Sequence, residues 1–189
     1  MIAYQKEKVE NAICFFASEH KKATRKPLYQ TYLYKYLAFF EFGHVKKFGR
    51  PPLGLKYVAM DRGPVPIEIY KKRGPYKTSY FAFQKISEDN FIVVSKGKPN
   101  LNYFSQIEQE EMHRLIKIFA DRFIDADVMS EASHQEIHAW RKTYSKKPNA
   151  PIDYQLTFDD GFDKKPAGDL SVAEENYLIF EALEKASAK

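Results

Sequence analysis

A long aromatic helix is the feature of this sequence that most constrains its fold. After Pro27, apolar and aromatic positions recur at the spacing of one helix face, and they are Tyr29, Leu33, Tyr36, Leu37, Phe40 and His44. Phe39 and Phe42 widen this stripe beyond what a surface helix needs. The helix is predicted to end near Phe48, because a proline pair follows at positions 51 and 52 and cannot continue the hydrogen-bond ladder. We therefore expect a central helix that is contacted on several sides.

The preceding and middle parts of the chain supply elements that can cover such a helix. An amphipathic helix is predicted over residues 4–20 from apolar positions at helical spacing. A short strand is expected at 56–60, a turn at Gly63-Pro64-Val65-Pro66, and a short helix at 67–72 that begins next to Pro66. Residues 79–85 and 90–95 are rich in aromatic and β-branched side chains, which predicts an antiparallel hairpin.

Helical patterns return in the last third of the chain. Ser105 with Glu108, and again Ser171 with Glu174, have the spacing of a capping box, in which each side chain accepts a hydrogen bond from the other residue's backbone N–H. The first box opens a predicted helix whose apolar face reaches Phe123, and the second opens a final helix to about residue 186. A shorter helix is predicted at 130–143, and residues 145–170 form a connection rich in Pro, Gly, Asp and Lys.

These elements predict an α+β fold that is mainly α-helical, with a small antiparallel β-element in the middle third. With 189 residues, of which 44% are hydrophobic, the chain is long enough for one domain with a real core. We expect the domain to span residues 1–143, followed by a polar loop at 144–170 and a C-terminal helix at 171–189 packed on the same domain.

Composition also limits where the protein works. The single cysteine, Cys14, excludes a disulfide within one chain, which favours a reducing compartment. No apolar run approaches the ~20 residues that a membrane span requires, and the first residues lack the apolar stretch of a signal peptide. We expect a soluble, cytoplasmic protein with no membrane partner.

The net charge of +5 conceals a division along the chain. Residues 1–99 carry 19 Lys and Arg against 8 Asp and Glu, which is +11, whereas residues 100–189 carry 11 against 17, which is −6. Such a dipolar charge distribution steers an acidic partner, whether nucleic acid or protein, and it equally suits two halves of one fold that attract each other.

Few residues suggest catalysis or metal binding. His134 and His138 lie four apart on the predicted helix and would share a face, but a metalloprotease needs Glu directly after the first His, and here Glu136 stands two positions on. Cys14 lies beside two phenylalanines on an apolar helix, which indicates core packing rather than a nucleophile. No nucleophile elbow, phosphate-binding glycine loop or dinucleotide fingerprint is present. We expect no catalytic residue, no cofactor and no metal.

A basic and aromatic segment is the best candidate for contact with a partner. Residues 70–77 mix cations with aromatic rings, a composition suited to phosphate contact with base stacking, to docking on an acidic protein, or to a solvated loop. The candidate partner-binding residues are Lys71, Lys72, Arg73, Tyr76 and Lys77. Trp140, the only tryptophan, is expected in the core.

Three separated stretches resemble one known family. The first is Lys35-Tyr36-Leu37-Ala38-Phe39-Phe40-Glu41-Phe42 with the following His44-Val45-Lys46-Lys47-Phe48-Gly49-Arg50-Pro51. The second is Gly54-Leu55-Lys56-Tyr57-Val58-Ala59-Met60 leading into Gly63-Pro64-Val65-Pro66, and the third is Ser133-His134 followed by Trp140. In this order they resemble the Panacea domain, the SocA-like antitoxin family also described as phage-associated proteins. Glu41 replaces the usual Asp, Tyr32 and Tyr34 replace Lys and Asn, and Arg62 replaces an aromatic residue.

The resemblance implies a prokaryotic antitoxin that neutralises its cognate toxin by direct binding, without catalysis. We assign a structural role first, and a recognition role second, to the motif residues Tyr57, Gly63, Pro64, Val65, Pro66, His134 and Trp140. From the residues alone, the alternatives are a nucleic-acid-binding regulator that uses the basic N-terminal half and a hydrolase built around His134 and Glu136.

Overall fold

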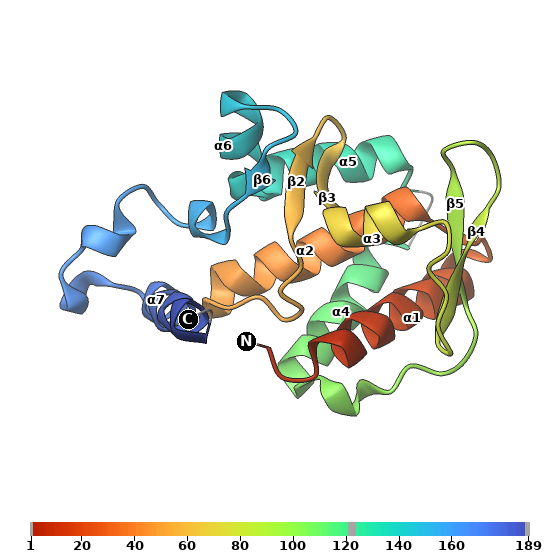
Figure 1. Ribbon diagram of the computed structural model, residues 1–189, viewed down its shortest axis with the longest axis horizontal. Coiled ribbons are helices and arrows are strands. Elements are labelled where there is room, and N and C mark those ends of the chain that lie inside the picture. The colour runs from red at the N-terminus through yellow and green to blue at the C-terminus, as the bar shows by residue number, and fades with distance from the viewer. Residues whose placement is uncertain (1, 121–123, 188–189) are drawn as a thin grey trace.

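The computed structural model describes residues 2–120 and 124–187, and its centre is the long aromatic helix α2 (Gln30–Phe48). Figure 1 shows α1 (Gln5–Thr24), α4 (Gln106–Phe119) and α5 (Ala126–Glu136) arranged around α2. Leu33, Tyr36 and Phe40 have no exposed surface, which agrees with the predicted central position. Tyr29 instead precedes the helix and is largely exposed in β1 (Leu28–Tyr29).

The predicted hairpin is confirmed by β4 (Phe81–Lys85) and β5 (Phe91–Ser95). The two strands are antiparallel with Phe83 opposite Val93, and β1 adds to the other edge of β5, so the sheet order is β1-β5-β4. The hairpin packs on α1. Cys14 of α1 donates a hydrogen bond from Sγ to the carbonyl of Gly97, which follows β5, at 3.3 Å. The expected mainly helical α+β class is therefore correct.

The predicted turn at 63–66 is wrong, because these residues form β3 (Gly63–Pro66), paired with β2 (Tyr57–Met60). The chain reverses at Asp61 and Arg62 instead. Pro64 lies opposite Ala59, whose backbone groups bond to Ala150 and Asn149 on the other side of β2. The prolines thus occupy positions of an edge strand that need no N–H donor, where proline is tolerated. The strand β6 (Pro151–Ile152) completes the order β3-β2-β6.

The single helix predicted at 130–143 is also wrong, because the chain breaks between α5 and α6 (His138–Lys146). At the break, Ile137 leaves helical geometry with φ −92° and ψ 85°, and its side chain is buried in the core. Burial of that side chain turns the backbone in a new direction, which the local spacing of apolar residues does not predict. The helix after β3, α3 (Ile67–Lys72), begins next to Pro66 as predicted.

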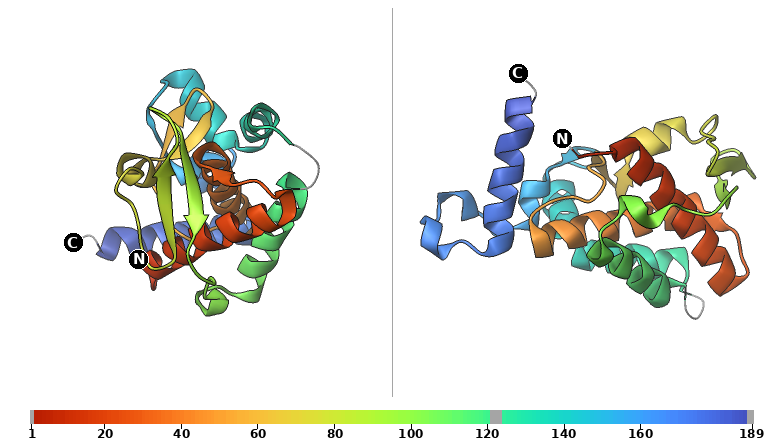
Figure 2. Two further views of the ribbon diagram at one scale, coloured as in Figure 1. Left: turned by 90° about the vertical axis from the view of Figure 1, so that its right-hand side faces the viewer. Right: turned by 90° about the horizontal axis from the view of Figure 1, so that it is seen from below.

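Residues 144–170, expected as a polar loop, hold several short elements. They are β6 and three short 3-10 helices, η2 (Tyr154–Thr157), η3 (Phe162–Lys164) and η4 (Ala167–Asp169). A further 3-10 helix, η1 (Leu101–Tyr103), lies earlier in the chain. Phe158 and Phe162 form a second buried cluster with Val45 and Tyr177. Tyr177 belongs to α7 (Val172–Ser187), which follows the Ser171–Glu174 capping box and stands out from the body in Figure 2.

The capping box that opens α4 has both predicted hydrogen bonds, from Ser105 N to Glu108 Oε2 at 2.8 Å and from Glu108 N to Ser105 Oγ at 3.3 Å. Glu108 also accepts from the buried Lys8 Nζ at 2.6 Å, which ties α4 to α1. Phe123, predicted on the same helix, lies outside the described residues. Among the described helices, none is long and apolar enough to cross a membrane.

Candidate functional site

The three motif stretches meet at one buried lysine. Lys35 extends from α2, and its Nζ donates hydrogen bonds to the Arg62 carbonyl, between β2 and β3, and to Ser133 Oγ on α5 at 2.9 Å. Residues 98 positions apart are thereby joined. Only 2% of Lys35 is exposed, and this burial, with the nearby charge of Arg62, lowers the pKa of its amine to about 7. The first motif stretch contains Lys35, but nothing in the sequence indicates that Arg62 and Ser133 are its hydrogen-bond partners.

Gly63 leaves the space that this lysine occupies. It has φ +109°, and a Cβ at this position would overlap Lys35 Nζ and approach Ser133 Oγ to 2.7 Å. Glycine is therefore required both by the backbone conformation and by the close approach of the amine. Tyr57, Pro64 and Pro66 line the same hairpin and are buried.

His134 and Trp140 come together because the helix breaks between them. Their rings stack with centroids 4.0 Å apart and planes inclined by 6°. Two residues six positions apart on one continuous helix would lie on different faces and could not stack in this way. Trp140 Nε1 donates to the Met60 carbonyl at 3.0 Å, so the pair also holds the β2–β3 hairpin. Burial and the charge of Lys35 lower the pKa of His134. His138 starts the next helix, so the two histidines do not share a helix face.

Glu41 is a buried carboxyl side chain on α2. In the sequence it was noted only because it replaces the Asp that is usual in the family. Its oxygens accept hydrogen bonds from Leu55 N at 2.9 Å and Leu53 N at 3.4 Å, which fixes the loop between α2 and β2. Burial raises the pKa of this carboxyl to about 8, although the backbone bonds and Lys8 act in the other direction.

The basic segment, which begins in the last turn of α3, divides into exposed and packed residues. Arg73 places its guanidinium carbon 3.9 Å from the centroid of the Tyr70 ring, and Nη1 donates to the Tyr70 carbonyl at 2.6 Å. Tyr76 packs edge-on against Phe81, with centroids 4.9 Å apart. The three exposed candidates are Lys71, Lys72 and Lys77.

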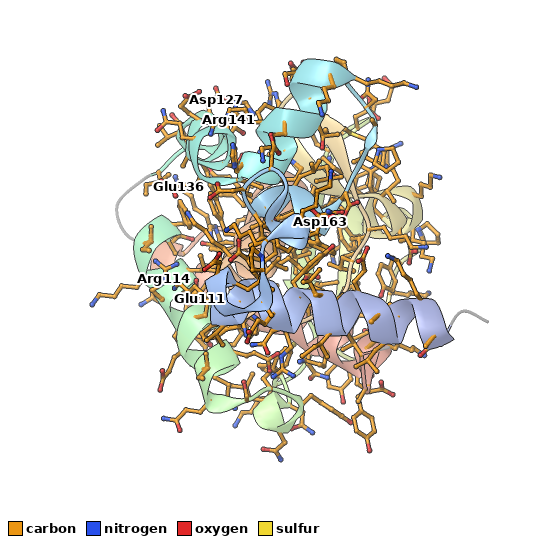
Figure 3. The ribbon with its side chains drawn as sticks, turned by 90° about the vertical axis from the view of Figure 1, so that its left-hand side faces the viewer. Glu111, Arg114, Asp127, Glu136, Arg141 and Asp163 are labelled. Carbon is orange, nitrogen blue, oxygen red and sulfur yellow. The ribbon has the colours of Figure 1, made fainter. Side chains whose placement is uncertain are left out.

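A hollow of about 880 Å³ lies between α2, α4 and the α5–α6 pair. Its apolar floor includes the stacked rings of Phe39 and Phe119, 4.7 Å apart. Charged residues form its walls, with Glu111 and Arg114 on α4 and Glu136 and Arg141 on α5 and α6 (Figure 3). Glu111 pairs with Arg114 at 2.6 Å and with Lys47 at 3.6 Å. A mixed-charge, apolar-floored groove suits a protein surface better than a small polar substrate.

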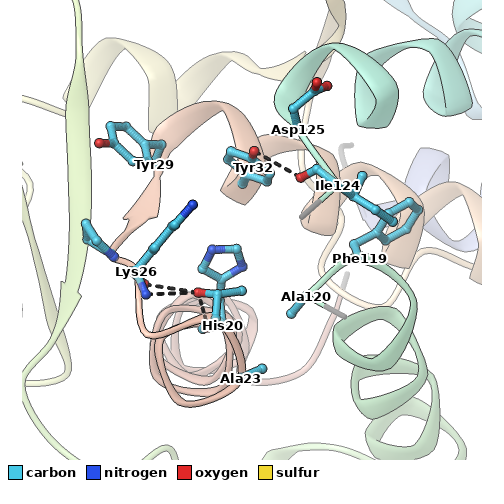
Figure 4. Close-up of a pocket in the computed structure, with 11 residues that line it drawn as sticks. His20, Ala23, Lys26, Tyr29, Tyr32, Phe119, Ala120, Ile124 and Asp125 are labelled. Carbon is cyan, nitrogen blue, oxygen red and sulfur yellow. Dashed lines mark hydrogen bonds between the residues drawn. The ribbon is translucent and has the colours of Figure 1, made fainter. Parts of the chain in front are cut away.

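A second hollow of about 460 Å³ lies at the other end of α2, where His20, Tyr32 and Asp125 face it (Figure 4). Each polar group already has an internal partner. Tyr32 donates to the Ile124 carbonyl at 3.1 Å, Asp125 accepts from Val128 N at 2.8 Å, and His20 Nδ1 lies 3.1 Å from the Tyr36 hydroxyl. Burial lowers the pKa of His20 to about 4, so its imidazole is neutral.

Within residues 2–120 and 124–187, no three His, Cys, Asp or Glu side chains lie close enough together to bind a metal ion. Burial raises the pKa of the Cys14 thiol, which disfavours the thiolate form.

Comparison with protein families agrees with this arrangement. The family model described as antitoxin SocA-like, Panacea domain, matches residues 33–141, which is more than half of the chain. This chain belongs to the SocA-like antitoxin family. The SocA-like region begins within α2, contains the Lys35 junction and the basic segment, and ends within α6. No curated protein and no solved structure matches the chain. Membership of the family supports an antitoxin role and implies a partner toxin.

Proposed function

We propose that this protein neutralises a toxin by binding it directly, with no chemical step of its own, in the cytoplasm. The observation that carries the proposal is the SocA-like match, because it covers α2 and the motif junction together. The geometry is consistent with binding, since two buried ionisable side chains on α2, Lys35 and Glu41, are used to hold other parts of the fold. Lys35 holds the hairpin and Ser133, and Glu41 holds the loop before β2.

We further propose that the exposed lysines of the basic segment steer the toxin. Lys71, Lys72 and Lys77 are exposed, whereas Arg73 and Tyr76 support the segment from within. Exposed charges act mainly on the rate of encounter, and salt screens them beyond ~8 Å at physiological ionic strength. The motif residues Tyr57, Gly63, Pro64, Val65, Pro66, His134 and Trp140 are proposed to have a structural role, because they gather around the hairpin and its neighbours.

The experiment is co-expression with the product of the neighbouring gene in a growth assay, followed by co-purification and binding kinetics. The wild type is expected to restore growth and to form a stoichiometric complex. Reversal of Lys71, Lys72 and Lys77 to Glu should lower the association rate more than it raises the dissociation rate. Reversal of Lys117, Lys146 and Lys147, which are also exposed but lie elsewhere, is the matched control.

The outcome also separates binding to a toxin from binding to nucleic acid. If the reversal at 71, 72 and 77 leaves toxin binding unchanged but abolishes retention of duplex DNA, the basic segment serves a nucleic-acid-binding regulator instead. That alternative predicts a log-log salt dependence with a slope close to the number of phosphates contacted. Growth that is not restored by the wild type contradicts the antitoxin proposal itself.

A further inference from the structure

The C-terminal helix α7 has two apolar faces, and its own chain covers only one. Ala173 and Tyr177 pack into the second core with Val45 and Phe162. Val172, Ile179 and Leu183 fall within about 40° of one another on a different face of a regular helix. These three side chains are 73%, 59% and 60% exposed. An apolar stripe of this kind is more than the fold of one chain requires.

The end of α7 also lacks packing within the chain. From Ala182 to Ser187 every residue is exposed, and Figure 2 shows the helix projecting from the body. Short helices without tertiary packing are marginally stable in water, so most of a helix's stability comes from burial of an apolar face. A partner on the exposed stripe would provide that burial.

Two residues of the stripe, Ile179 and Leu183, line a hollow of about 690 Å³ between α7 and the body, whose lining is partly apolar and partly charged. Its lining includes Tyr4, Ile107, Ile179 and Leu183, which are four of the nine large apolar side chains that are strongly exposed in the described part of the chain. Contiguous exposed apolar surface of this kind marks an interaction site.

Charge indicates what fits this hollow. Across it, Lys8 and Glu108 neutralise each other at 2.6 Å, whereas the exposed Arg50 makes no ion pair with the residues that the structure describes. The helix α7 itself carries four glutamates against one lysine, and two of these glutamates already have ion pairs, Glu174 with Lys165 at 2.8 Å and Glu181 with Lys185 at 2.9 Å. An acidic helix with an apolar stripe therefore complements the hollow, and α7 of a second copy has both properties.

We propose that the exposed face of α7 is a homodimer interface, in which α7 of each of two copies packs antiparallel in the hollow of the other. In a two-fold arrangement every contact occurs twice, so one apolar stripe and one hollow serve both chains. Arg50 follows Gly49, which lies against Ala173 and Tyr177 at the start of α7. The antiparallel direction brings the acidic second half of the other α7, where Glu181 also pairs with Lys185 at 2.9 Å, beside Arg50. The helix α7 lies outside the SocA-like match, whereas the hollow includes residues within it, and self-association is a property beyond toxin binding.

The test is the oligomeric state of the purified chain by sedimentation and light scattering, from low to high micromolar concentration. The wild type should have twice the chain mass of 22.1 kDa at the high end and dissociate on dilution. The double variant Ile179→Glu, Leu183→Glu should stay monomeric throughout with an unchanged circular dichroism spectrum, because both side chains are exposed in the monomer. The matched control is Ile86→Glu, Ile118→Glu, which changes two exposed isoleucines elsewhere and should dimerise as the wild type does.

Arg50→Glu tests the direction of the helices, and it should weaken dimerisation about tenfold at low salt and less at high salt. A wild type that is monomeric at every concentration overturns the proposal, as does a dimer that Ile179→Glu, Leu183→Glu leaves unchanged. A monomeric wild type whose neutralisation of a toxin is lost in that double variant also overturns it, and assigns the hollow to the toxin.

Discussion

Replacement of Gly63 by alanine tests whether the Lys35 junction holds the fold. The new Cβ would overlap Lys35 Nζ and lie 2.7 Å from Ser133 Oγ, at a backbone φ of +109°. The backbone conformation alone costs an alanine about 1–2 kcal/mol. Displacement of a buried, hydrogen-bonded amine adds about 1.5–3 kcal/mol. We therefore expect Gly63→Ala to lower the free energy of unfolding by about 4 kcal/mol, which is a large part of the stability of an ordinary domain.

The measurement is urea unfolding followed by the fluorescence of Trp140, the only tryptophan of the chain. With a slope of about 2 kcal/mol per molar urea, the midpoint should fall by about 2 M. Gly161→Ala is the matched control, because Gly161 has φ +79° but its Cβ would meet no atom within 4 Å. That variant should show the backbone cost alone.

A double-mutant cycle isolates the contact itself. In a Lys35→Ala background the amine is gone, so Gly63→Ala should cost less than in the wild type by at least 1 kcal/mol, roughly the coupling expected of residues in contact. Equal losses in Gly63→Ala and Gly161→Ala, or full additivity with Lys35→Ala, would refute the proposed junction.

Three further predictions concern Glu41, Gly49 and His134. Burial raises the pKa of Glu41 in the folded state to about 8, so between pH 4.5 and 8 the folded chain holds a proton that the unfolded chain has released. The free energy of unfolding should therefore fall as pH rises through this range. Urea midpoints measured from pH 4.5 to 8 should show that Glu41→Gln removes this contribution. Gly49→Ala should detach α7, because its Cβ would overlap the Ala173 carbonyl, and limited proteolysis should then cleave α7 selectively. Since Gly49 has φ +75°, the Trp140 unfolding midpoint should fall only by the backbone cost that Gly161→Ala shows. His134→Ala should lower thermal stability by only about 1 kcal/mol, since it mainly removes a stacked ring pair, and His134→Phe should recover most of that loss.

Local patterns in the sequence determined most of the secondary structure. The two capping boxes predict where α4 and α7 begin, because the Ser and Glu side chains bond within one turn of the chain. The aromatic stripe predicts α2 and its central position, and the β-branched runs predict the β4–β5 hairpin. The motif stretches predict the family, which the match over residues 33–141 shows. In each case the deciding residues are close together in the sequence.

Only the tertiary structure decided how these elements meet. Residues 63–66 form a strand rather than a turn because β2 offers an edge at which Pro64 needs no N–H donor. The helix breaks at Ile137 because the core takes that side chain, and the break lets His134 stack on Trp140. Lys35 and Ser133 are joined across 98 positions, and Arg73 packs on Tyr70 although its neighbours in the basic segment are exposed. Contacts between residues far apart in the sequence set these outcomes, and such contacts leave no periodic signal in a single sequence.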